Sequence, residues 1–258
     1  MSNYPKTKPK EMSNFGTLLT ENNIKSSHRW GPSAVSHIEG ALSCGSFKGM
    51  SKSLRKNITY SFQYLQYIQL QIDELNLHSV IYTQLCKSYV IISMGIIEGI
   101  FYHLLKTAGK YKKEEWEELL TVKTNEFNDN GSIKKHIILT YQKLTVPKEG
   151  KMDFESMIQK IRSCNLIKLS QEAYPYIKDL KEIRNKVHLH ISKDDNDTDY
   201  HKLSHVEYYL ARHALYKVLT NEVFDPKNQG GVFNCIELSK EKNSEIATIL
   251  HKRRENKK

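Results

Sequence analysis

Residues 89–101 read Tyr-Val-Ile-Ile-Ser-Met-Gly-Ile-Ile-Glu-Gly-Ile-Phe, and this stretch decides the fold that the sequence predicts. Wound into a helix, it is apolar on nearly every side. Such a helix must be covered by other elements all round, so it belongs at the centre of a core. We therefore expect a long helix over about residues 79–107, with the other elements packed around it.

The segments around this central helix show the apolar spacing of amphipathic helices. Before it, spacings of three and four link Leu54, Ile58, Phe62, Leu65, Ile68, Ile72 and Leu75. After it, we expect helices over 112–122, from Ser132, from Asp153, from near Pro175 and over about 201–221. The turn Asn128-Asp-Asn-Gly131 precedes the second of these. With no convincing strand alternation, the sequence predicts an all-α fold, an antiparallel helical bundle with insertion helices.

Three regions are expected along the 258 residues. Residues 1–50 are polar and weakly periodic, so we expect a poorly structured and partly disordered N-terminal extension. Residues 51–222 should form the helical domain, which is long enough to bury a core. Residues 223–258 should form a C-terminal segment with a basic tail that starts at Lys252.

The composition indicates a soluble globular protein with a net charge of +10. This charge favours a polyanionic partner such as RNA, although lysine-rich surfaces also occur without one. The four cysteines form no C-x-x-C pair, so we expect reduced thiols, no metal and no cofactor. The N-terminus has no secretory signal, and the apolar stretch 90–105, interrupted by Glu98 and His103, falls short of a membrane span. We expect a cytoplasmic protein with no membrane partner.

The strongest chemical constellation lies at residues 180–191, Leu-Lys-Glu-Ile-Arg-Asn-Lys-Val-His-Leu-His-Ile. It places Arg184, Asn185, His188 and His190 within seven residues. An arginine can hold a phosphate through two hydrogen bonds, and a histidine can move a proton near neutral pH. These are the groups that RNA cleavage without a metal requires.

This stretch resembles the R-x(4–6)-H signature of the HEPN superfamily, with five residues between Arg184 and His190 and with Asn185 in the polar position after the arginine. The long helix pair and an Ile-Ile-Glu-Gly element in its second helix extend the resemblance over residues 51–222. The resemblance implies a HEPN-like helical bundle, a homodimer with a composite active site, and a metal-independent endoribonuclease. It also implies a toxin or antiviral defence effector that cleaves tRNA or other cellular RNA, with an antitoxin or another regulatory partner protein.

The resemblance further implies roles for the motif residues. Arg184 would hold the scissile phosphate, and a neutral histidine would take the proton of the 2′-OH or protonate the leaving 5′-oxygen, giving a 2′,3′-cyclic phosphate and a 5′-OH. Asn185 would orient the phosphate or brace the histidine. His190 has the family spacing, but on an ideal helix it lies about 120° from Arg184, against about 40° for His188. His190 can join Arg184 only if the helix ends or distorts, or if the histidine comes from another subunit, so both histidines stay open.

Glu98 is a carboxylate inside the apolar central helix, where an ionised acid needs a partner. It is expected either to hold Arg184 or a motif histidine as a supporting acid, or to form a buried structural pair with any nearby lysine or arginine. Tyr60, Tyr64 and Tyr67 form an aromatic face on the first long helix, which we interpret as a packing or dimer surface. The alternatives to a nuclease are a non-catalytic HEPN-like module for dimerisation or RNA and protein binding, and a helical scaffold with no nucleic-acid role.

Overall fold

Helix α4, Ser79–Thr107, is the central element of this computed structural model, which describes residues 20–21, 24–25, 31–170, 173–187, 198–199 and 203–255. The helix begins after His78, whose ring nitrogen accepts a hydrogen bond from the amide of Val80. Residues from several of its sides are fully buried, among them Tyr89, Val90, Met94, Ile97 and Ile100. The predicted helix over 79–107 is confirmed.

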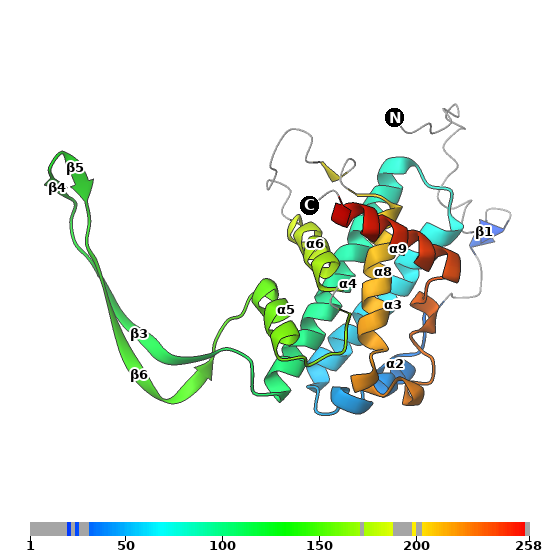
Figure 1. Cartoon of the computed structure of the whole chain (residues 1–258), viewed down its shortest axis with the longest axis horizontal. Helices are drawn as coiled ribbons and strands as arrows, with labels where there is room; N and C mark the ends of the chain where they lie inside the picture. The colour runs from blue at the N-terminus through cyan, green and yellow to red at the C-terminus, as the bar shows by residue number, and fades with distance from the viewer. Residues whose placement is uncertain are drawn as a thin grey trace.

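Four helices pack directly against α4 (Figure 1). They are α3 (Lys52–Glu74), α5 (Phe154–Ser163), α6 (Ala173–Asn185) and α8 (His205–Leu219). Three of them start with a capping side chain, because Ser51, Asp153 and Ser204 each accept a hydrogen bond from a backbone amide of the first turn. Helices were expected in all four regions, and these expectations are confirmed apart from the helix ends.

Two further helices and four 3₁₀ turns belong to the described part of the helical body. Helix α2 (Val35–Ala41) packs on α3, and helix α9 (Lys240–Glu255) packs on α8. The 3₁₀ turns are η1 (Gly45–Phe47), η2 (Glu222–Phe224), η3 (Pro226–Asn228) and η4 (Asn234–Ile236). Two short strands near the N-terminus, β1 (Thr20–Glu21) and β2 (Ile24–Lys25), pair with each other.

The core includes residues on both sides of the predicted 51–222 domain. Phe47 of η1 stacks on Phe224 of η2 with ring centroids 3.7 Å apart, and Phe233 meets Phe62 of α3 edge to face at 5.2 Å. Gly45 allows the close approach of η1 to η2, because its φ is +49° and a Cβ there would come within 2.5 Å of the Phe224 backbone. The helical body therefore extends from α2 to α9.

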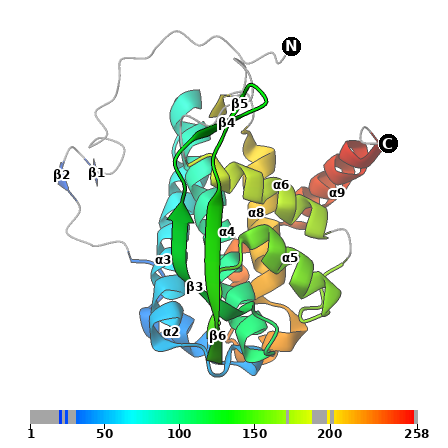
Figure 2. The same ribbon diagram turned by 90° about the vertical axis from the view of Figure 1, so that its left-hand side faces the viewer.

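A long antiparallel hairpin projects from the helical body and connects α4 to α5 (Figures 1 and 2). Its main strands are β3 (Lys113–Lys123) and β6 (Ile137–Glu149), and β4 (Phe127–Asp129) pairs with β5 (Ser132–Lys134) at its tip. The tip turns at Asn130 and Gly131, whose φ values of +52° and +80° are those of a two-residue hairpin turn. We call residues 113–149 the arm.

The prediction of an all-α bundle is wrong, because the arm makes this a mixed α/β fold. The helices expected over 112–122 and from Ser132 are strands β3, β5 and β6. Apolar residues at spacings of three and four imitate a helical stripe there, yet Ile133, Ile137 and Tyr141 are exposed. The β-branched residues of β6 and the Asn-Gly pair favour a hairpin, and these local preferences prevail because no core contact opposes them.

Among the described residues, one helix has the length and apolar composition to cross a membrane, and it is α4. This differs from the expectation that its apolar stretch falls short of a span. Most of the apolar window is buried inside the protein, as in a core helix. The four helices packed around α4 account for its apolar composition.

Candidate functional site

Arg184 and Glu98 form an ion pair across the contact between α6 and α4. Nη2 of Arg184 lies 2.5 Å from Oε2 of Glu98. Arg184 stands in the last turn of α6, and Glu98 lies in the second half of α4. The buried residues Ile177 and Leu180 hold α6 against the helical body. The packing of two helices thus brings together residues that are 86 positions apart in the sequence.

The pair lies at the edge of the core, neither fully buried nor fully exposed. The Arg184 side chain is 36% exposed and the Glu98 side chain 24%. Burial raises the pKa of the Glu98 carboxyl above its ordinary value, and the Arg184 guanidinium opposes that rise only in part. Glu98 therefore needs Arg184 as a partner, while the arginine still faces solvent on one side. The position of Arg184 at a helix C-terminus also favours its positive charge.

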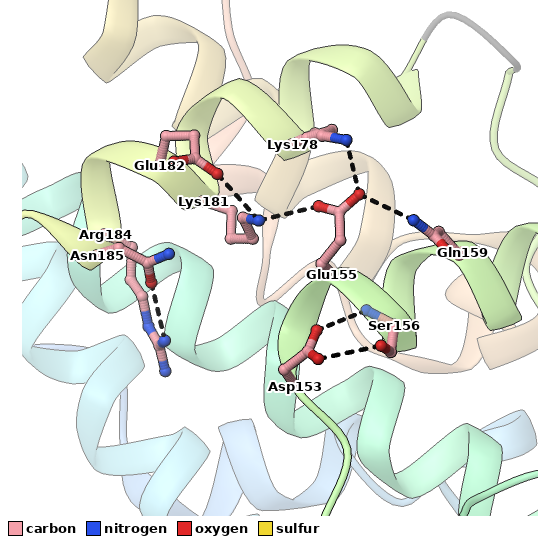
Figure 3. Close-up of polar contacts among 9 residues, drawn as sticks. All are labelled: Asp153, Glu155, Ser156, Gln159, Lys178, Lys181, Glu182, Arg184 and Asn185. Carbon is pink, nitrogen blue, oxygen red and sulfur yellow. Dashed lines mark hydrogen bonds and ion pairs between the residues drawn. The ribbon is translucent and has the colours of Figure 1, made fainter. Parts of the chain in front are cut away.

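Asn185 holds the other end of the guanidinium. Nη1 of Arg184 donates a hydrogen bond to Oδ1 of Asn185 at 3.3 Å (Figure 3). Asn185 is exposed, so this bond competes with water and exchanges more easily than the bond to Glu98. An incoming phosphate oxygen can replace the amide at Nη1 without breaking the Arg184–Glu98 pair.

Helix α6 ends at Asn185, immediately after the arginine. The amides of Lys186 and Val187 bond to carbonyls three residues back, at 3.0 and 3.3 Å, in the tight turn that closes many helices. Val187 is exposed beyond the helix end. His188 and His190 lie outside the described residues. The angular comparison between them assumed a helix that continues past Asn185, so it no longer counts against His190.

A second ion pair with α4 is made by Asp199, which follows these histidines in the sequence. Nζ of Lys87 in α4 lies 2.8 Å from Oδ2 of Asp199, and Gln84 donates to the same oxygen at 3.3 Å. Lys87 is buried, which makes this pairing necessary for its charge. Lys87 and Glu98 are eleven residues apart in α4, which puts them about 20° apart around the helix and about 16 Å apart along it. One side of α4 thus holds both Arg184 and Asp199.

A polar cluster between α5 and α6 fixes the position of α6. Glu155 in α5 binds Lys178 at 2.8 Å and Lys181 at 2.9 Å, and it accepts a hydrogen bond from Gln159 at 3.1 Å (Figure 3). Lys181 also binds Glu182 at 3.0 Å. These bonds lower the pKa of Glu155 to about 2, with Lys178 as the largest cause. The cluster lies within one turn of Arg184, so it orients the helix end that carries the arginine.

The sequence analysis did not single out these two supporting contacts. Lys178 and Lys181 are three residues apart on one helix face, a spacing that can hold a carboxylate between them. The buried lysine of α4, Lys87, was the available signal, because a lysine in an apolar helix needs an acidic partner.

The structure brings together three of the predicted site residues, Arg184, Asn185 and Glu98. Glu98 contacts Arg184, which fits both interpretations of Glu98, and its catalytic relevance stays a prediction. Within the described part of the chain, no group of three or more histidine, cysteine, aspartate or glutamate side chains is placed to hold a metal ion. No family model matches the chain, no curated protein matches it, and no solved structure matches it.

Proposed function

We propose that this chain is a metal-independent endoribonuclease of the HEPN type, a toxin or antiviral defence effector that cleaves tRNA or other cellular RNA. The observation that carries this proposal is the state of Arg184. It is oriented by Glu98, is still accessible, and stands at a helix end, with His188 four and His190 six positions further along the chain. The net charge of +10 supports an RNA partner.

In the proposed reaction, Arg184 binds the scissile phosphate. Nη1 exchanges Asn185 for a non-bridging oxygen, while Glu98 keeps Nη2 and the orientation of the guanidinium. The 2′-oxygen attacks phosphorus, its proton passes to a neutral histidine, and the bond from phosphorus to the 5′-oxygen breaks. The leaving 5′-oxygen takes a proton from a histidinium, which leaves a 2′,3′-cyclic phosphate and a 5′-OH. Arg184 acts mainly in the transition state, where the phosphate carries most charge.

His188 and His190 are the candidates for these proton transfers. A histidine with a pKa near 6.5 can act as base or acid near neutral pH. Asn185, once released from Arg184, would orient the phosphate or brace a histidine. The reaction needs both a base and an acid, and a homodimer with a composite site would supply a second set of these side chains.

The test is an RNA cleavage assay with purified protein in the presence of EDTA. Bulk tRNA and a single-stranded RNA serve as substrates. The two product ends are tested separately, for a 2′,3′-cyclic phosphate on one fragment and a 5′-OH on the other. Arg184→Ala should abolish cleavage. Arg162→Ala is the matched control, because Arg162 lies in α5 over the Tyr174 ring of α6 and is not part of the Arg184–Glu98 ion pair. Equal activity of both variants, or a requirement for a divalent ion, would contradict the proposal.

A non-catalytic module for dimerisation or RNA binding is the second candidate. The observation that favours it is the ion pair itself, because Glu98 neutralises the charge that Arg184 would offer to a phosphate. Such a module would bind RNA without cleaving it. RNA binding in a gel-shift experiment, together with unchanged RNA length after long incubation, would select this alternative.

A further inference from the structure

The arm exposes more apolar surface than a free hairpin should. Eleven large apolar side chains between residues 113 and 149 are 37% to 74% exposed. They are Trp116, Leu119, Leu120, Val122, Phe127, Ile133, Ile137, Ile138, Leu139, Tyr141 and Val146. At roughly 150–250 Å² for a large side chain, these fractions correspond to on the order of 1,000 Å² of apolar surface. A typical monomer exposes patches of only about 300–600 Å².

Both faces of the arm are apolar. Residues that pair across the two strands lie on one face, so Val122 and Ile138 share a face, while Leu139 and Tyr141 lie on the opposite one. The sheet has only two strands, and each strand has one unpaired edge. A two-stranded hairpin is marginally stable alone and needs packing against another element. The arm therefore needs cover on its sides.

The helical body of the same chain does not provide this cover. The arm is fastened at its base, where Glu149 binds Tyr102 and Lys106 of α4 at 2.7 Å. Beyond the base, the main packing partner of each strand is the other strand. Figures 1 and 2 show the arm extending away from the body on the side where α3, α4 and α6 lie. The exposed residues are therefore available for contact with another molecule.

Charge identifies the kind of molecule. The arm carries six lysines and seven acidic residues, which gives it a net charge of −1. Since the whole chain has a net charge of +10, the residues outside the arm together carry +11. Four glutamates, Glu114, Glu115, Glu117 and Glu118, lie on β3 alone and are exposed. Glu117 already pairs with Lys148, and Glu114 with Lys112. The remaining negative charge of this strand disfavours nucleic acid and favours contact with lysines of a second copy.

The body carries a surface that matches the arm. Tyr60, Tyr64 and Tyr67 lie on the outer side of α3 and are 37% to 52% exposed, and Val80 and Ile81 at the start of α4 are exposed as well. Lys52, exposed in the first turn of α3, and Lys56, one turn later, offer positive charge to the glutamates of β3. A stable interface needs about 800 Å² from each partner, and in a reciprocal dimer each partner contributes both an arm and a tyrosine face.

We propose that the arm packs on the tyrosine face of α3 in a second copy of this chain, and that the exchange is reciprocal. Two arms are then covered at once, because a two-fold dimer repeats each contact. The inference rests on exposure and charge, and it does not depend on the proposed nuclease activity. A dimer that leaves RNA intact contradicts only the proposed function, and a monomer that cleaves RNA contradicts the dimer and the composite site but leaves the nuclease activity standing.

The experiment measures the mass of the full chain by light scattering after size exclusion, from 1 to 100 μM. The chain has a mass of 30.0 kDa, so we expect twice that mass for the unchanged protein. Leu120→Lys/Ile138→Lys in the arm and Tyr60→Ala/Tyr64→Ala in α3 should each give the monomer mass over the same range. Ala247→Lys/Thr248→Lys on the exposed side of α9 adds the same charge as the arm variant and should remain a dimer.

The α3 variant keeps the test decisive if the arm variant unfolds, because the arm stays intact in it. A second measurement uses chemical cross-linking of a mixture of ¹⁴N- and ¹⁵N-labelled protein. We expect mixed-isotope cross-links between lysines of the arm, such as Lys123 or Lys143, and Lys52 or Lys56 of α3. A monomeric unchanged protein at 100 μM, a dimer that survives both variants, or arm-to-α3 cross-links confined to one isotope would overturn the proposal.

Discussion

Nη2 of Arg184 lies 2.5 Å from Oε2 of Glu98, and this contact fixes the arginine at the C-terminal end of α6 against the side of α4. A guanidinium held on one side and open on the other is already oriented for an anion. Orientation before binding lowers the entropic cost of using the arginine in a reaction. The same contact removes a half-buried unpaired carboxylate from α4, so it contributes to both stability and the proposed chemistry.

The two contributions can be separated with a double variant. Arg184→Ala should abolish RNA cleavage and destabilise the fold by about 1–3 kcal/mol, because it leaves Glu98 half-buried without its partner. Arg184→Ala/Glu98→Gln should recover most of that stability, since the glutamine carries no charge, and should remain inactive. Urea unfolding gives the stability, and the EDTA-resistant cleavage assay gives the activity. An active double variant would show that Arg184 is not the phosphate-binding group.

The raised pKa of Glu98 predicts a pH dependence of stability. A carboxyl whose pKa is higher in the folded state makes no differential contribution below its unfolded value near 4.5, and it destabilises the fold progressively as the pH rises from that value through the raised folded value. The free energy of unfolding of the unchanged protein should therefore fall, relative to that of Glu98→Gln, as the pH rises from 4.5 toward 7. Urea unfolding at several pH values measures this difference. A difference that grows in the opposite direction would mean that Arg184 outweighs burial at this site.

The helices of the body were predictable because their signals are local. The stripe through α3, the all-round apolarity of α4 and the caps at Ser51 and Asp153 are all read within a few residues. The arm was mispredicted because it buries almost nothing. Without a buried face, strand alternation carries no apolar signal, and residues such as Ile133, Ile137 and Tyr141 have helical spacing by composition alone.

The candidate site was predictable only in part. Arg184 and Asn185 are adjacent in the sequence, so a motif could name them together. The contact with Glu98 depends on how α6 packs against α4, and the sequence showed only that Glu98 needed some partner. The end of α6 at Asn185 depends on a tight turn whose residues, Lys186 and Val187, carry no glycine or proline to mark it.

The Glu155 cluster predicts a loss of stability in acid. The pKa of Glu155 is lowered to about 2 by Lys178 and Lys181, so its contribution is complete above the unfolded value near 4.5 and is lost as the pH falls toward 2. Glu155→Gln should be less stable than the unchanged protein at pH 6, and the two should converge toward pH 2. Glu241→Gln is the control, because Glu241 is an exposed acid in the first turn of α9. Circular dichroism across an acid titration follows both variants.

The same cluster should affect activity without touching RNA. If it orients the end of α6, Glu155→Gln should lower cleavage severalfold while Arg184 stays in place. The loss should be larger at 37 °C than at 15 °C, because a loosened helix end moves more at the higher temperature. Activity equal to that of the unchanged protein at both temperatures would restrict the cluster to a role in stability.

The two histidines can be distinguished by their substitution to alanine. Since α6 ends at Asn185, helix geometry no longer disfavours His190, and its five-residue separation from Arg184 is the spacing that the resemblance implies. We expect His190→Ala to lower the cleavage rate by about 10² to 10⁴, the range for loss of a general acid or base. His188→Ala should have a milder effect, and His205→Ala, which removes a half-exposed histidine beside Glu245, should have none. The pH profile of the remaining activity adds a second readout, because loss of the proton-transfer group should remove one limb of the profile near the histidine pKa.

If His188→Ala lowers the cleavage rate more than His190→Ala does, proton transfer belongs to His188. Unchanged rates in both would remove histidine, and with it the proposed mechanism.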